Sequence, residues 1–106
     1  MQADATVETF PELVQDGVVL IDFWGPNCAP CLALMPHVEA LVGRLGERVR
    51  LVKVNAPENR QICRDLRVFG LPTYLVLRNG EEVERLSGDP SLEDLEDAVG
   101  RVMGGE

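Results

Sequence analysis

Cys28 and Cys31 are separated by two residues, a spacing that is typical of reactive cysteine pairs. They follow a largely apolar stretch, residues 18–24, and open a stretch with apolar residues at helical spacing, residues 28–45. The free N–H groups and the dipole at the start of a helix favour a thiolate, and they lower the pKa of such cysteines to about 3.5–7.5 from about 8.5. We therefore expect Cys28 to be a nucleophile in thiol–disulfide exchange, and Cys31, one turn further on and buried, to resolve the mixed disulfide. Pro30 fits the first turn of this helix, where its missing N–H costs little.

A Cys-x-x-Cys pair can also be half of a zinc site, or two inert thiols packed in a core. Zinc usually takes four ligands, and besides the pair the chain offers only Cys63 and His37, with no second closely spaced pair. Redox chemistry is therefore the favoured interpretation, and no metal site is expected. Cys63 lies on an apolar stripe, which predicts a buried, inert cysteine; regulatory oxidation or dimer formation are the alternatives. His37 is expected to be an exposed helix residue.

Asp22 is the one charged residue within the apolar stretch 18–24. A carboxylate buried there without a partner would be costly, so we expect the group to be protonated or hydrogen-bonded, with a raised pKa. The alternative is a side chain that faces solvent at a strand end.

These residues must be positioned by an alternation of strands and helices. Asn79-Gly80 between two β-prone segments predicts a tight hairpin, and Ser91 with Asp94 three residues later predicts a helix start. Parallel strands come first and an antiparallel pair follows, which indicates an α/β fold. The predicted helices cover residues 6–16, 28–45, 57–68 and a last segment from Ser91; the predicted strands cover 18–24, 49–55, 73–77 and 82–86.

Composition narrows the class of protein. The chain has 106 residues, 45% apolar and 26% charged, which predicts one compact domain and excludes a two-domain enzyme. Purely apolar runs such as residues 18–21 are far short of the roughly 20 residues that span a bilayer. A net charge of −8 opposes binding to nucleic acid or anionic lipid. The first residues lack the pattern of a signal peptide, so we expect a cytoplasmic protein, and a monomer.

Several segments together resemble the thioredoxin family, in its order and with its intervals, over about residues 5–104. They are Asp22-Phe23-Trp24, Cys28-Ala29-Pro30-Cys31, Pro36, Leu71-Pro72-Thr73, Asn79-Gly80 and Gly88. The resemblance implies a thioredoxin fold, with a central four- to five-stranded mixed β-sheet flanked by about four helices, in a single domain, residues 1–106. It also implies a dithiol that reduces disulfides in other proteins, a redox-active Cys28–Cys31 disulfide, no tightly bound cofactor, and an NADPH-linked thioredoxin reductase as electron source.

The resemblance also implies roles for residues around the dithiol. Asp22 would lie beneath it and help to move the proton of Cys31, and Lys53 would neighbour that aspartate and lower the pKa that burial raises. Without the resemblance, Lys53 would be read as a solvated strand residue.

A groove for extended client peptides is implied in the same way. Pro72 would be cis and pack against the dithiol, which leaves the backbone of Leu71 to pair with a client. Trp24, Gly25 and Gly88 would line the groove, although Trp24 could be a core residue.

The chain departs from the family pattern beside the dithiol. Asn27, Ala29 and Leu32 stand where many thioredoxins have tryptophan, glycine and lysine, and Pro57 replaces an aspartate of a surface loop. Loss of the cation at Leu32 weakens thiolate stabilisation, so we expect these departures to affect redox potential and partner choice. A thiol oxidant or isomerase on the same scaffold, or a non-catalytic binding module, are the alternative functions.

Overall fold

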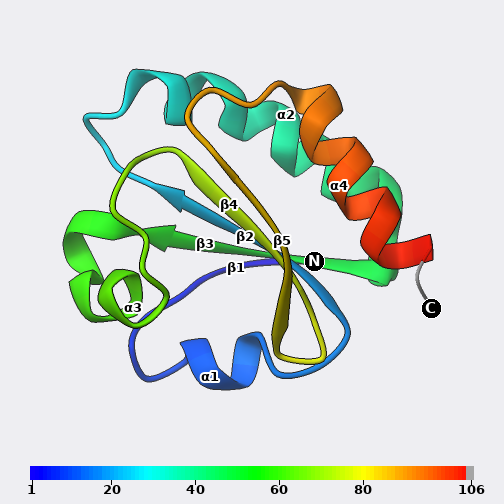
Figure 1. Ribbon diagram of the computed structural model, residues 1–106, viewed down its shortest axis with the longest axis horizontal. Coiled ribbons are helices and arrows are strands. Elements are labelled where there is room, and N and C mark those ends of the chain that lie inside the picture. The colour runs from blue at the N-terminus through cyan, green and yellow to red at the C-terminus, as the bar shows by residue number, and fades with distance from the viewer. Residues whose placement is uncertain (105–106) are drawn as a thin grey trace.

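The computed structural model describes residues 1–104, which form a five-stranded mixed sheet and four α-helices (Figure 1). This confirms the predicted fold class; the last two residues of the predicted domain lie outside the described part. The strands are β1 (Gln2–Asp4), β2 (Val18–Trp24), β3 (Val49–Asn55), β4 (Thr73–Arg78) and β5 (Glu81–Ser87). The helices are α1 (Phe10–Leu13), α2 (Ala29–Leu45), α3 (Arg60–Asp65) and α4 (Leu92–Gly104), with short 3-10 helices η1 (Gly46–Arg48) and η2 (Ala56–Glu58).

Strand β2 is the central strand of the sheet, whose order is β1-β3-β2-β4-β5. It pairs parallel with β3 and antiparallel with β4, and its first six residues are buried, as the near-continuous apolar run predicts. The carboxyl end of β2, the carboxyl end of β3 and the start of β4 therefore meet at one edge of the sheet. Loops that lead from this edge can bring distant parts of the chain together.

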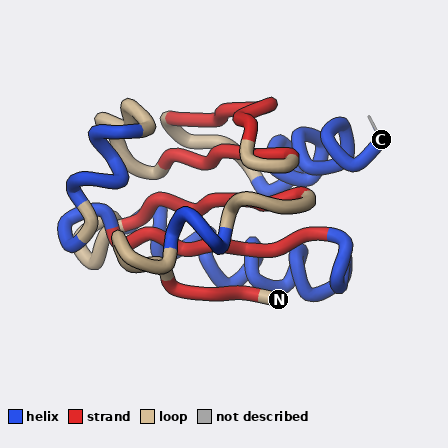
Figure 2. The backbone as a smooth tube through the Cα atoms, turned by 90° about the horizontal axis from the view of Figure 1, so that it is seen from below, coloured by secondary structure: helices blue, strands red, loops and turns tan. Residues whose placement is uncertain are grey.

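Two layers of helices cover the sheet (Figures 1 and 2). Helices α2 and α4 pack on one face and form a core with alternate residues of β2, including Val18 and Leu20. Helices α1 and α3 lie on the other face, over a second core that includes Val19, Ile21 and Phe23. Successive residues of β2 thus pack into the cores on opposite faces of the sheet. The side chain of Asp22, two residues after Leu20, therefore points toward α2.

Local sequence signals account for the ends of several elements. Asn79 and Gly80 have φ angles of 50° and 85°, the left-handed conformation that a two-residue hairpin turn requires. The Ser91 amide donates to Asp94 Oδ2 at 2.9 Å and the Asp94 amide donates to Ser91 Oγ at 3.0 Å, a reciprocal cap at the start of α4.

Two predicted helices differ from the structure, and one strand is absent from the prediction. The first helix is only Phe10–Leu13, because Thr6 and Thr9 exchange backbone and side-chain hydrogen bonds in a turn before it. The helix predicted for residues 57–68 is divided at Asn59, whose φ of −135° and ψ of 51° are not helical, into η2 and α3. Strand β1 was not predicted; it is three residues long and is held by parallel pairing with β3.

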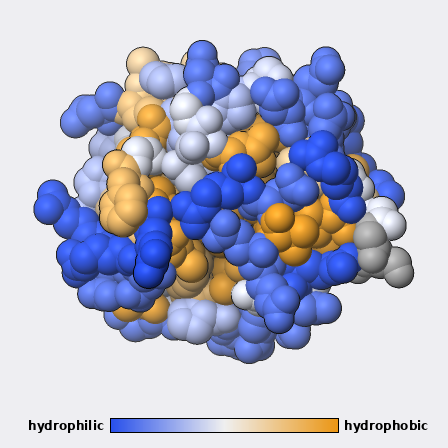
Figure 3. Space-filling model, viewed as in Figure 1, coloured by the Kyte–Doolittle hydropathy of each residue, from blue (hydrophilic) through white to orange (hydrophobic). Residues whose placement is uncertain are grey.

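On the face shown in Figure 3, hydrophilic side chains predominate and apolar side chains gather in separate small patches. Within residues 1–104, no helix has the length and apolar character needed to cross a membrane.

Candidate active site

The cysteine pair lies at the start of α2, directly after the loop that follows β2. Cys28 is the N-cap of α2 and is half-buried, whereas Cys31 in the first turn is fully buried. The two sulfurs form a disulfide with the Cα atoms 5.3 Å apart. The Cys31 amide donates to Cys28 Sγ at 3.3 Å, so a backbone N–H and the positive end of a 17-residue helix both face this sulfur. This arrangement favours a thiolate on Cys28 and leaves Cys31 shielded from solvent.

Gly25 allows the turn before the dithiol to approach the loop before β4. A Cβ at Gly25 would lie 3.2 Å from Leu71 Cδ1, closer than a side chain normally comes. Leu71 precedes Pro72 through a cis peptide bond, as the resemblance implied. Because no side chain intervenes, the segment Leu71–Pro72 is held next to the start of α2.

Two hollows flank Leu71–Pro72. One, of about 310 Å³, brings the active-site Pro30 together with Pro72. Its lining residues are Pro30, Ala33, Leu34, Pro72, Asp89 and Pro90. The other, of about 350 Å³, lies on the Leu71 side and is lined by residues of η2, α3 and the segment 68–71, including Phe69, which is 86% exposed. These two hollows, one lined by Leu71 and the other by Pro72, are together called the track.

Asp22 lies under α2 at the centre of the sheet. Its side chain is two residues beyond Leu20 and is fully buried, and within residues 1–104 neither carboxyl oxygen has a hydrogen-bond partner. Burial raises the pKa of Asp22 to about 7, against a smaller lowering effect of Lys53. The expected raised pKa is therefore present, and the solvent-facing alternative for this side chain is excluded.

Lys53 is opposite Asp22 in the register of β2 and β3, but its ammonium group pairs elsewhere. Lys53 Nζ lies 2.9 Å from Glu39 Oε2 and 3.7 Å from Asp4 Oδ1. The described residues thus show no direct Lys53–Asp22 ion pair, but Lys53 neighbours Asp22 in the sheet and its charge lowers the pKa of Asp22 through space, as expected. The two carboxylates are partly exposed and keep some hydration, so pairing with them avoids moving the ammonium group into the dry core.

Tyr74 is a buried neighbour of Asp22 that the sequence reasoning missed. It is opposite Asp22 in the register of β2 and β4, and its hydroxyl has no hydrogen-bond partner within residues 1–104. Burial raises the pKa of this hydroxyl. A polar aromatic residue at the start of a buried strand was the available signal.

The other residues singled out in the sequence lie on several elements. Trp24 ends β2, is half-buried, and belongs to neither core cluster; Gly88 has a φ of +84°, which favours glycine, and a Cβ there would meet no atom within 4 Å. Cys63 is free and half-buried rather than fully buried, and it lines the hollow beside Leu71. Burial raises the pKa of the Cys63 thiol, which fits a less reactive cysteine. His37 is exposed, as expected.

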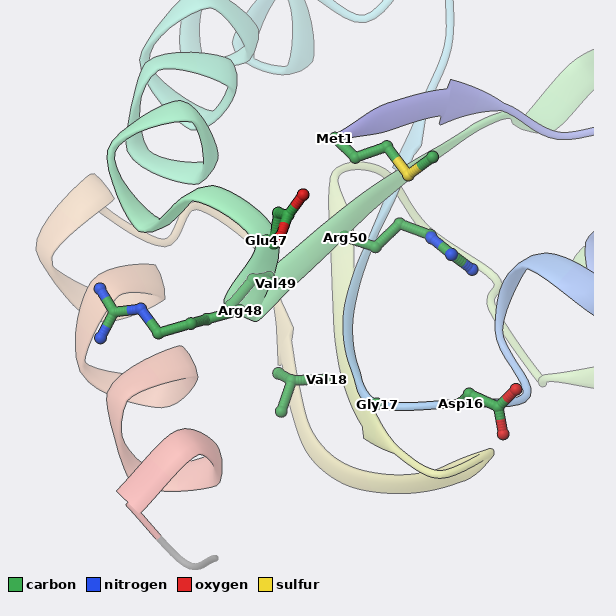
Figure 4. A pocket seen from close by; sticks show the side chains of 8 residues that line it. All are labelled: Met1, Asp16, Gly17, Val18, Glu47, Arg48, Val49 and Arg50. Carbon is green, nitrogen blue, oxygen red and sulfur yellow. The ribbon is translucent and has the colours of Figure 1, made fainter.

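A larger hollow, of about 430 Å³, lies at the opposite end of the sheet near Val18 and Val49 (Figure 4). The guanidinium groups of Arg48 and Arg50 extend in opposite directions there, so its charged side chains do not converge on a common point. Within residues 1–104, no group of three or more His, Cys, Asp or Glu side chains is placed to hold a metal ion.

A disulfide at a helix N-terminus, with a half-exposed and a buried sulfur beside a cis-proline loop, defines a thiol–disulfide oxidoreductase. Comparison with known proteins agrees: the thioredoxin family model matches residues 2–101. The chain is 37% identical to thioredoxin of Bacillus subtilis over 93% of this chain and 95% of that protein, and 32% identical to thioredoxin of Listeria monocytogenes over 97% and 100%. A mutant thioredoxin from Halobacterium salinarum NRC-1 has a similar structure, with a TM-score of 0.86 and 27% identity over 94% of this chain and 88% of that one.

The chain therefore belongs to the thioredoxin family. Its activity is the reduction of protein disulfides by dithiol–disulfide exchange.

Proposed function

We propose that Cys28 and Cys31 reduce client disulfides in two steps. The Cys28 thiolate attacks one sulfur of the client disulfide, forms a mixed disulfide, and releases the other client sulfur as a thiolate that takes up a proton. Cys31 then loses its proton and attacks Cys28 Sγ, which releases the second client sulfur and forms the Cys28–Cys31 disulfide. Two electrons pass to the client, which becomes a dithiol.

The half-buried position of Cys28 carries this assignment of roles. An attacking sulfur must be reached by a client, and Cys28 is accessible while Cys31 is not. Cys28 Sγ also faces the Cys31 amide at 3.3 Å, which would stabilise a thiolate after the disulfide is reduced.

Asp22 is proposed to accept the proton that Cys31 loses. A general base is most effective when its pKa is near the working pH, and the pKa of Asp22 is about 7. Lys53 is proposed to act on Asp22 only through its charge, since its ammonium pairs with Glu39 and Asp4.

The track beside Leu71 and Pro72 is proposed to hold the client in an extended conformation. The two hollows would accept side chains on either side of the client cysteine, while the Leu71 backbone pairs with the client main chain. Trp24, Gly25 and Gly88 would form the borders of this track.

Recycling needs a separate electron donor. We assign this role to an NADPH-linked thioredoxin reductase, acting on a monomer in the cytoplasm, without a cofactor bound tightly to the chain itself.

Trapping of clients tests the two cysteine roles. Cys31→Ser leaves the attacking sulfur but removes the resolving one, so covalent complexes with disulfide-containing proteins should accumulate and dissolve on addition of dithiothreitol. Cys28→Ser should trap none, and Cys63→Ser should behave as the unchanged protein. Equal trapping by Cys28→Ser would contradict the assignment.

A further inference from the structure

Four charged or polar side chains form a row across the sheet beneath α2. Strand register places Asp4 beside Lys53, Lys53 beside Asp22, and Asp22 beside Tyr74. Glu39 reaches this row from α2, eight residues, or about two turns, after Cys31. The buried residues of α4 are apolar, so among residues 1–104 the ionisable groups that face Asp22 from the packed elements are those of the row, Glu39 and the cysteine pair.

Lys53 lies between Asp22 on one side and Glu39 with Asp4 on the other, and its ammonium group contacts only Glu39 and Asp4. Its ammonium is 2.9 Å from Glu39 and 3.7 Å from Asp4, whereas neither oxygen of Asp22 has a partner within residues 1–104. Asp4 has a side chain 78% exposed, against 32% for Glu39 and 15% for Lys53. The Glu39 contact is thus the shorter and the less hydrated of the two, and it is the one that restrains the ammonium.

We propose that Glu39 is a positioning residue for proton transfer at the dithiol, because it holds the Lys53 ammonium away from the Asp22 carboxyl. This inference rests on the proposed role of Asp22 as the proton acceptor for Cys31. Glu39 lies two turns from the cysteines and itself takes no part in the exchange of sulfur bonds.

The physical consequence concerns the strength of the base. An opposite charge within about 4–6 Å lowers the pKa of a carboxyl by 1–3. If Lys53 turned from Glu39 to Asp22, the aspartate would become a weaker base and would take the Cys31 proton less readily. Glu39 therefore keeps the base effective near neutral pH by engaging the competing cation.

Titration of the Asp22 carboxyl by carbon-13 NMR tests the proposal in the oxidised protein. The Asp22→Asn variant identifies the resonance. Glu39→Gln keeps the size of the side chain but removes its charge, and it should lower the pKa of Asp22 by about 1 or more. Glu39→Asp should recover most of the original value, because it restores an anion near Lys53.

Asp4→Asn is the matched control, since it also removes one negative charge beside Lys53 but leaves the 2.9 Å contact with Glu39. It should change the pKa of Asp22 by less than half as much. An equal effect of the two variants, or no shift in Glu39→Gln, would overturn the proposal.

A double-mutant cycle with Lys53→Met separates positioning from the direct repulsion between Glu39 and Asp22. In the Lys53→Met background, Glu39→Gln should lose more than half of its effect on the Asp22 pKa. If the effect is unchanged, Glu39 acts only as a nearby charge, and the positioning role is wrong.

Kinetics distinguish this failure from failure of the proposed function. Stopped-flow measurement of the resolving step across pH should show an acidic limb that moves in Glu39→Gln by the same amount as the Asp22 titration. A titration that shifts without any change in the rate profile would reject Asp22 as the proton acceptor, and with it the catalytic consequence assigned to Glu39. If the pKa of Asp22 does not shift in Glu39→Gln, the positioning of Lys53 by Glu39 is wrong, while the role of Asp22 as proton acceptor is unaffected.

Discussion

At the level of single residues, the burial of Asp22 favours its proposed role as a base but lowers the stability of the fold when the carboxyl is ionised. Its burial in an apolar layer, with no hydrogen-bond partner in the described part of the chain, raises its pKa to about 7, where a base for Cys31 is useful. The same burial makes the ionised form unfavourable in the folded protein.

The Asp22→Asn variant measures that cost. The pKa of Asp22 is raised from 3.8 to about 7, so between these values the folded protein holds a proton that the unfolded chain has released. The free energy of unfolding therefore falls as the pH rises through this window and levels above it. Asn carries no charge, so the variant should match the parent near pH 4 and be more stable at pH 8, by up to about 4 kcal/mol. Urea denaturation at several pH values tests this; a stability difference independent of pH would contradict it.

Much of the residue-scale picture could be predicted from the sequence. A lone aspartate in an apolar strand predicts a raised pKa, and Cys-x-x-Cys after a buried strand predicts which sulfur is exposed. The partner of Lys53 could not be predicted, because Glu39 is 14 residues away in the chain and meets Lys53 only through the packing of α2 on the sheet. Tyr74 was missed for the same reason, since strand pairing alone brings it beside Asp22.

At the level of elements, α2 begins with the two reactive cysteines, and α4 packs beside α2 on the same face of the sheet. Four residues of α4 are buried in the core shared with β2 and α2. The reciprocal bonds between Ser91 and Asp94 begin α4 at the end of the loop that follows β5. Loss of this cap should weaken the fold without altering the dithiol.

Ser91→Ala should lower the free energy of unfolding by about 1 kcal/mol, because the Asp94 amide loses its acceptor. Ser87→Ala is a matched control on the exposed end of β5 and should change stability by less than about 0.5 kcal/mol. Chemical denaturation gives both values. Unchanged stability in Ser91→Ala would show that the cap contributes nothing, and altered disulfide reduction at constant stability would show that α4 acts on the site.

Long elements could be predicted from the sequence, whereas short ones could not. The apolar run of β2 and the helical spacing of α2 each extend over enough residues to show their period. Strand β1 has three residues and no alternation, and its place depends on pairing with β3. The division between η2 and α3 depends on the conformation of Asn59, which residue type alone does not reveal.

At the scale of the whole molecule, a net charge of −8 on 106 residues gives the protein a negative field. Leu32, 44% exposed, follows the buried cysteine and carries no charge, so no cation at this position offsets the field beside the dithiol. Cationic clients should therefore approach faster than anionic ones.

Reduction rates of two disulfide peptides with equal sequence lengths and opposite net charges test this field. The cationic peptide should react several-fold faster at about 0.01 M salt, where charges interact over about 30 Å, and the ratio should approach one at about 1 M salt. A neutral peptide should show little dependence on salt. A preference for the anionic peptide at low salt would contradict the prediction.

A redox titration of the Cys28–Cys31 couple decides whether the protein is a reductase, because a reductase and an oxidant on this scaffold differ in potential. Equilibration with glutathione or dithiothreitol buffers, followed by alkylation of free thiols, gives the fraction reduced, and Cys63→Ser removes the third thiol from the count. For a protein-disulfide reductase we predict a potential of about −270 mV, the value of thioredoxin. A value of about −120 mV, as in an oxidising relative of the family, would contradict the assignment as a reductase, because that disulfide would oxidise client proteins instead of leaving them reduced.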